Sequence, residues 1–199
     1  IGCKEADATI VSFHATKVFN TFEGGAIIST DDELQKRFNL IRNFGFDGPD
    51  SVLEIGMNGK MSEAHAAMGI VNLRYIDECI AKRKLVFETY RDRLSACSHV
   101  ELMNIFNHKN PNFAYLPVKC TLGERRRDVI LKALESQNIF ARKYYYPLLS
   151  NTSHYKNIGS ACPSKLPNAN ILSQTVLCLP IYPSLAQEKI HQICDVIQA

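Results

Sequence analysis

Apolar and polar positions alternate along the chain with two different periods, which predicts short strands separated by helices. The apolar, β-branched segments that predict strands are residues 9–13, 26–30, 113–119, 139–146 and 176–179. The segments that predict helices, with apolar side chains three and four residues apart, are residues 31–42, 62–96, 124–137 and 184–197. Residues 43–60 are rich in glycine and predict a long loop. This alternation predicts a layered α/β or α+β fold.

The longest predicted helix, residues 62–96, carries one apolar stripe and is long enough to connect two packed units. The stripe consists of Met61, Ala64, Met68, Val71, Tyr75 and Cys79. We place a domain boundary near residue 85, which divides the chain into residues 1–85 and 86–199. Only two strands are predicted before this boundary, whereas a doubly wound sheet usually has about five or more. The first part therefore has too few strands to close a sheet of its own.

Composition narrows the class of protein. Of the 199 residues, 46% are hydrophobic and 22% are charged, which is ordinary for a globular protein and argues against disorder. The net charge of +3 is too small to indicate a nucleic-acid partner. No apolar run approaches the roughly 20 residues of a membrane-spanning helix. The basic run within residues 124–127 opens a predicted helix and indicates a solvated helix face.

The seven cysteines indicate reduced thiols in a cytoplasmic protein. Their odd number and the absence of C-x-x-C spacing argue against a disulfide framework and a zinc ribbon, so we expect no metal site. Most of them lie in apolar stretches, where a free thiol packs as a small hydrophobe. Residues 1–7 have neither an initiator methionine nor the pattern of a signal peptide. We therefore expect the sequence to begin inside a longer polypeptide.

The densest cluster of chemically useful side chains follows the first predicted strand. It consists of Ser12, His14, Thr16, Lys17, Glu23, Gly24 and Gly25. A lysine that follows a strand is most often a solvated surface charge. The apolar strand before Lys17 and the Glu-Gly-Gly that leads into the next strand favour a held amine that acts as a nucleophile. Ser12 can donate its hydroxyl to a phosphate, and the glycines permit close approach of the backbone.

Seven short motifs occur in an order that covers essentially the whole chain. They are SFHATK at 12–17, EGGA at 23–26, RNFG at 42–45, GMNGKMSE at 56–63, AAMG at 66–69, RKYYYP at 142–147 and LPIYPS at 179–184. Together they resemble the DegT-type sugar-nucleotide aminotransferases, which are pyridoxal-phosphate enzymes of the aspartate aminotransferase fold, fold type I. The sequences NTFE at 20–23 and RKYYYP at 142–147 are most similar to those of members acting on dTDP-4-keto-6-deoxyhexoses.

The resemblance implies roles for particular residues. Lys17 matches the lysine that forms the internal aldimine with pyridoxal 5'-phosphate and then moves the proton. Ser12 matches the hydroxyl that holds the cofactor phosphate. Asn58 matches an asparagine that reaches the cofactor phosphate of the neighbouring subunit, which implies a homodimer with shared active sites. The residues implied on the nucleotide-sugar side are His14, Lys60, Arg142 and Tyr145, with Lys60 standing where many members carry arginine.

The resemblance also implies an activity: transfer of an amino group from glutamate to a keto sugar on a nucleotide, in deoxysugar biosynthesis such as that of lipopolysaccharide O-antigen. Members are roughly twice this length, because a complete parallel sheet precedes the lysine. We therefore expect residues 1–85 to be the C-terminal part of the large cofactor-binding domain and residues 86–199 to be the small α+β domain. The alternative is a truncated, catalytically inactive remnant with a binding or dimerisation role.

Overall fold

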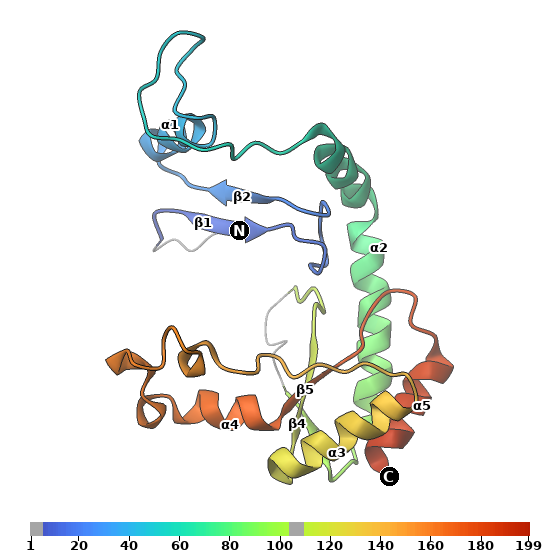
Figure 1. The fold of residues 1–199 in the computed structure, drawn as a ribbon. Coiled ribbons are helices and arrows are strands. Elements are labelled where there is room, and N and C mark those ends of the chain that lie inside the picture. Colours follow the sequence, from blue (N-terminus) through green and yellow to red (C-terminus); the bar gives the residue numbers. More distant parts are fainter. Residues whose placement is uncertain (1–5, 104–109) are drawn as a thin grey trace. The chain divides into compact units, whose positions relative to one another are not determined.

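The computed structural model describes residues 6–103 and 110–199, and these divide into two compact units, residues 1–77 and 78–199 (Figure 1). The division falls within helix α2 (Glu63–Leu94), which supplies residues to both units. It comes earlier than the boundary near residue 85. The assignment of the two parts as pieces of a cofactor-binding domain and a small domain remains a prediction.

The first unit is built on a two-stranded antiparallel sheet. Strands β1 (Thr9–Ser12) and β2 (Gly25–Ile28) pair so that Ser12 lies opposite Gly25. Helix α1 (Asp32–Ile41) follows, and its N-terminus is capped by the carboxylate of Asp31, which accepts hydrogen bonds from the backbone N–H of Glu33 and Leu34. Both predicted strands and the predicted helix of this part are confirmed.

The predicted loop 43–60 is confirmed, and its backbone conformation requires a glycine at position 45. Gly45 has a φ of +81°, and a Cβ atom there would lie 1.8 Å from the carbonyl oxygen of Glu54. Only glycine allows this close approach of the two sides of the loop. An isolated antiparallel bridge between Asn43 and Asn58 closes the base of the loop. Asn58 is thereby fixed to the end of α1.

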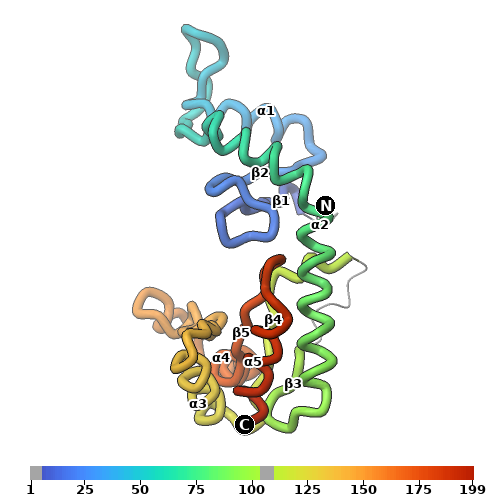
Figure 2. Tube along the Cα trace, turned by 90° about the vertical axis from the view of Figure 1, so that its right-hand side faces the viewer, coloured from blue at the N-terminus to red at the C-terminus, as the bar shows by residue number. Residues whose placement is uncertain are grey.

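The second unit has a three-stranded antiparallel sheet in the order β3 (Val100–Leu102), β4 (Leu116–Cys120), β5 (Val176–Leu179). Helix α3 (Gly123–Ser136) and the second half of α2 lie on either side of the strands (Figure 2). Helix α5 (Gln187–Gln198) completes the core, and helix α4 (Pro167–Thr175) packs on α3. The fully buried aliphatic residues of this core are Leu94, Leu116, Val118, Ile130, Leu134, Leu177, Ile190, Ile193 and Ile197.

The strand predicted over 139–146 is wrong. Within it only Arg142 pairs with a strand, and both of its backbone hydrogen bonds, of 3.0 and 2.8 Å, go to Cys178. The chain then turns, because the N–H of Tyr146 bonds to the carbonyl oxygen of Lys143. The side chains of 144–146 therefore do not alternate between two faces of a sheet. Strand β3 and helix α4 were not predicted, since the first is only three residues long and the second has no apolar periodicity.

Three of the described cysteines confirm the expectation of thiols packed as hydrophobes. Cys120, Cys178 and Cys194 are buried, and burial raises the pKa of each thiol to about 11. Cys162 is exposed and does not share this environment. Among the helices of the described residues, none is both long and apolar enough to cross a membrane.

Candidate functional site

Lys17 lies in the turn, residues 13–24, that connects the two paired strands of the first unit. The N–H of Phe13 donates to the carbonyl oxygen of Gly24 at 2.9 Å, and the N–H of Thr21 donates to the carbonyl oxygen of Phe13 at 2.9 Å. These two hydrogen bonds join the two ends of the turn. Within it, the N–H of Lys17 donates to the carbonyl oxygen of His14 at 2.9 Å. The antiparallel pairing of β1 and β2 therefore fixes both ends of the segment that carries the lysine.

Thr21 anchors this turn, a role that was not predicted from the sequence. Its side chain is 2% exposed, and its Oγ1 donates to the carbonyl oxygen of Glu23 at 2.5 Å. A Cβ atom at Gly24 would lie 2.6 Å from Thr21 Oγ1, and one at Gly69 on α2 would lie 2.9 Å from Thr21 Cγ2. The two glycines thus leave the space in which Thr21 is buried. The signal in the sequence is a small β-branched residue beside two glycines, which is too common to be specific.

The structure brings together three of the predicted site residues. Lys17 is half-buried, while Ser12 and His14 are exposed. Ser12 Oγ accepts a long hydrogen bond of 3.4 Å from the N–H of His14. The His14 ring lies 2.9 Å from Thr16 Oγ1 through Nδ1 and 3.5 Å from the carboxylate of Glu23 through Nε2. One turn therefore presents a hydroxyl, an imidazole and a primary amine.

Asn58 and Lys60 lie in the long loop of the same unit and are exposed. Asn58 Oδ1 accepts a hydrogen bond of 3.4 Å from the N–H of Lys60, and Lys60 Nζ lies 5.0 Å from the centre of the Phe44 ring. In the part of the chain that the structure describes, no recorded hydrogen bond or ion pair joins these two side chains to Ser12, His14 or Lys17. Beside them, Ile55 is 96% exposed and Met57 is 65% exposed.

Arg142 and Tyr145 belong to the second unit and are both exposed. The Arg142 guanidinium donates to the hydroxyl of Tyr144 at 3.1 Å and lies 5.8 Å from the centre of its ring. The ring of Tyr144 packs on Tyr145 at 4.8 Å and, edge to face, on Tyr115 at 5.4 Å. A guanidinium thus stands beside a cluster of phenol rings, a combination suited to an anionic ligand with planar or sugar parts.

Tyr145→Phe is expected to lower the pKa of Tyr115. A hydrogen bond with Tyr145 is the largest cause, ahead of burial, that raises the pKa of Tyr115 to about 12. A raised pKa stabilises the folded state fully below pH 10, and this contribution is lost as the pH rises through 12. The variant should therefore show phenolate absorbance at lower pH. The titration step of Tyr115 is assigned with Tyr115→Phe. If the midpoint of that step is the same in Tyr145→Phe as in the unmodified chain, the contact between the two tyrosines is contradicted.

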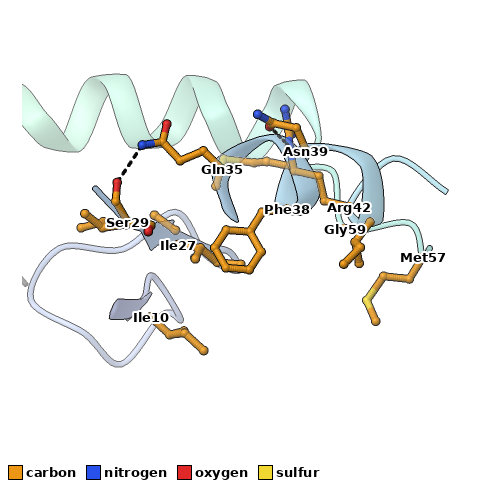
Figure 3. Close-up of a pocket in the computed structure, with 14 residues that line it drawn as sticks. Ile10, Ile27, Ser29, Gln35, Phe38, Asn39, Arg42, Met57 and Gly59 are labelled. Atoms are coloured by element: carbon orange, nitrogen blue, oxygen red, sulfur yellow. Dashed lines mark hydrogen bonds between the residues drawn. The ribbon is translucent and has the colours of Figure 1, made fainter. Parts of the chain in front are cut away.

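A cavity of about 850 Å³ lies elsewhere in the first unit, between β2 and α1 (Figure 3). Ile10, Ile27 and Phe38 give it apolar walls, and Gln35 closes one end by donating from Nε2 to the carbonyl oxygen of Ser29 at 2.8 Å. Gly25 lines it, but none of the residues predicted to bind cofactor or substrate does. Its lining is mainly apolar, with Ser29, Gln35, Asn39 and Arg42 as its polar side chains.

Comparison with known proteins agrees with these observations. Two curated relatives, both dTDP-4-amino-4,6-dideoxy-D-glucose transaminases, are 35% identical over 98% of this chain (Shigella dysenteriae) and 39% identical over 88% (Escherichia coli). The structure of DesI with its TDP-sugar product superimposes with a TM-score of 0.86 at 32% identity, over 97% of this chain. A putative PLP-dependent aminotransferase from Bacillus cereus superimposes at 0.83 and 28%, over 96%.

The matches cover only part of each known protein. The chain spans 53% and 48% of the two relatives and 49% and 51% of the two solved chains. The predicted fold class is confirmed: the chain has the α/β fold of one half of a fold-type-I sugar aminotransferase. The family model of the DegT/DnrJ/EryC1/StrS aminotransferases matches residues 2–198. The chain therefore belongs to the DegT/DnrJ/EryC1/StrS aminotransferase family.

Proposed function

We propose that this chain is the lysine-bearing half of a pyridoxal-phosphate-dependent sugar-nucleotide aminotransferase. The reaction would move an amino group from glutamate to a keto sugar carried by a nucleotide. The observation that carries the proposal is the turn between β1 and β2, which holds Lys17, Ser12 and His14 together in a member of this family. Because the chain spans about half of its relatives, the activity is assigned to the complete polypeptide.

The residues of the turn fit the cofactor. Among the ion pairs of the described residues, none involves Lys17 Nζ, so the amine is not committed to a carboxylate. Ser12 Oγ is exposed and accepts only the long bond from His14, which leaves its O–H to donate to a phosphate oxygen. A primary amine for an aldehyde and a hydroxyl for a phosphate are the two groups that pyridoxal phosphate requires here.

In the proposed reaction the cofactor, when bound, supplies the electron sink for the carbanion chemistry. Lys17 Nζ would hold the aldehyde; once the amino donor had displaced the lysine, Nζ would take the proton from the donor's α-carbon as a general base and deliver it, as a general acid, to the carbon that had carried the aldehyde. Ser12 would bind the phosphate end and so help to position the cofactor relative to the amine. His14, which is exposed and lies within contact distance of Glu23 and Thr16, would contact the sugar.

The names of the relatives support a dTDP-linked hexose as the substrate. Lys60 in the first unit and Arg142 in the second are each suited to an anionic group of the substrate such as a phosphate, because each is an exposed cation without a carboxylate partner among the described ion pairs. Tyr145, 65% exposed beside the other phenol rings, would stack on the nucleotide or the sugar. A keto group on the hexose is the acceptor that amino transfer requires.

A homodimer would complete the site. Asn58 is exposed in a loop whose neighbouring side chains Ile55 and Met57 are apolar and largely in solvent. An apolar patch around a polar amide is typical of an interface that a second copy covers. In that arrangement Asn58 would donate from Nδ2 to the cofactor phosphate held by the other subunit.

The coverage of the relatives also favours a second candidate, a chain that binds or dimerises without catalysis. About half of each relative's length lies outside the match. The two candidates differ in one measurement, amino transfer to the dTDP-linked keto sugar by the 199-residue chain alone. Turnover without further protein excludes the binding role. No turnover by the chain, together with turnover by the complete polypeptide, shows that the missing half supplies part of the site.

Borohydride trapping tests the cofactor assignment directly. The complete polypeptide is mixed with pyridoxal phosphate, reduced and digested, and the modified lysine is mapped by mass. We expect the label to concentrate on Lys17 and to leave exposed lysines such as Lys36 largely unmodified. Equal label on many lysines, or none, would contradict the assignment of Lys17.

A further inference from the structure

Two asparagines tie the Lys17 turn to helix α2. Asn72 lies on α2, and its Nδ2 donates to the carbonyl oxygen of Asn20 at 2.8 Å, although 52 residues separate the two. Asn20 in turn donates from Nδ2 to the carbonyl oxygen of Lys17 at 3.2 Å and accepts from the N–H of Phe22 at 3.4 Å. The first two of these hydrogen bonds are partly buried. One continuous chain of amide groups therefore runs from α2 to the backbone of the lysine.

The helix approaches the turn closely enough to hold it. Gly69 precedes Asn72 by one helical turn, and a Cβ atom there would lie 2.9 Å from Thr21 Cγ2. The absence of a side chain at Gly69 thus brings α2 against the buried Thr21, and Asn72 then reaches Asn20. Carbonyl oxygens withdrawn from water need a donor, and for the carbonyl of Asn20 that donor comes from the helix.

We propose that Asn72 is a positioning residue for Lys17, acting through Asn20. The inference rests on the proposed function, in which Lys17 Nζ must meet an aldehyde carbon at a fixed distance. The backbone of Lys17 is held locally by the bond to His14 and, from the other side, by Asn20. Loss of the bond from α2 would let the segment 17–20 shift, and a shift of the order of 1 Å is enough to slow a positioned reaction.

Asn72→Asp in the complete polypeptide tests this with almost no change in side-chain volume. The carboxylate cannot donate and would face the carbonyl oxygen of Asn20. We expect borohydride-trapped pyridoxal phosphate at Lys17 to fall about tenfold at a limiting cofactor concentration, while label on Lys36 is unchanged. Asn20→Asp, which removes the donor to Lys17 but keeps the acceptor for Phe22, should have a similar effect. Asn72→Gln keeps a donor and should recover most of the label.

Asn170→Asp is the matched control. Asn170 also donates from Nδ2 to a backbone carbonyl, that of Leu166, at 2.8 Å in a partly buried setting, but it belongs to α4 of the second unit. Its variant should lose a comparable hydrogen bond without changing the label on Lys17. Equal loss of label in the Asn72→Asp and Asn170→Asp variants would mean that general destabilisation is the cause, which overturns the proposal.

Amide hydrogen exchange over residues 17–22 separates this proposal from the function on which it rests. Faster exchange in Asn72→Asp together with lower label supports the positioning role. Faster exchange with unchanged label overturns it, because the turn would then move without consequence for Lys17. Unchanged exchange overturns it as well. Absence of selective label in the unmodified polypeptide would refute the cofactor assignment, whereas the exchange difference would still report whether α2 holds the turn.

Discussion

Lys17→Ala is expected to abolish amino transfer by the complete polypeptide and to remove the trapped cofactor from position 17. The proposed mechanism has Lys17 Nζ both hold the aldehyde and move the proton, and a positioned acid–base group alone contributes about 10²–10⁴ in rate. We therefore expect turnover to fall at least that far. The measurement is the initial rate of amino-sugar formation, with mass mapping of the reduced adduct on the same preparation.

Two control variants, Lys17→Arg and Lys36→Ala, test whether the loss of activity is specific to the amine of Lys17. Arginine keeps the positive charge but is not a usable nucleophile, so Lys17→Arg should be as inactive as the alanine variant. Lys36 lies in the same unit and is exposed, paired with Glu33 at 2.7 Å, and a surface pair of this kind contributes little to stability. Its alanine variant should retain full activity. Retained turnover in Lys17→Ala would exclude the lysine-based mechanism for this chain.

The cluster around Lys17 could be predicted from the sequence because its members are close neighbours along the chain. Strand β1 ends at Ser12 and strand β2 begins at Gly25, and antiparallel pairing of the two strands brings Ser12 opposite Gly25. The side chains between them must then lie in one short turn. The long loop was predictable for a related reason, since only glycine fits at Gly45.

Contacts between distant segments could not be predicted in the same way. The bond from Asn72 to Asn20 joins residues 52 positions apart, and an asparagine on an amphipathic helix is ordinarily read as a solvated residue. The segment 142–147 failed for a different reason. Its tyrosines have a high intrinsic preference for strands. After Arg142, however, the chain forms a turn in which the N–H of Tyr146 bonds to the carbonyl oxygen of Lys143. Strand preference depends on context, and here the tertiary surroundings override it.

Arg127 is the clearest case in which the prediction of a solvated helix face was wrong. The run of basic residues at the start of α3 suggested a helix face in water, yet Arg127 is 0% exposed. Its guanidinium donates to the carbonyl oxygen of Ser173 at 2.7 Å, to Asp128 at 2.9 Å and to Glu124 at 3.1 Å. No pattern in the sequence distinguishes this arginine from its exposed neighbour Arg125, because the partner Ser173 comes from α4.

Arg127→Met is accordingly expected to destabilise the second unit by about 1–3 kcal/mol, the usual cost of leaving a buried acceptor without its donor. Methionine fills much of the volume but leaves the carbonyl of Ser173 without its donor, and it removes the cation that lies 5.4 Å from the centre of the Tyr146 ring. The measurement is urea unfolding followed by circular dichroism, since the chain has no tryptophan. Arg125→Met, at an exposed position of the same helix turn, should change the free energy of unfolding little.

The pH dependence of this loss has a defined sign. The hydrogen bond from Lys143, at 2.7 Å, and the bond from Arg127 hold the pKa of the Asp128 carboxyl below its usual range. A lowered pKa stabilises the folded state above the unfolded pKa near 3.8, and this contribution is lost as the pH falls through the folded pKa. The difference between the unmodified chain and Arg127→Met should therefore shrink in acid. If it stays constant, or if Arg127→Met is as stable as the unmodified chain at neutral pH, the ionic network does not hold α3 against α4.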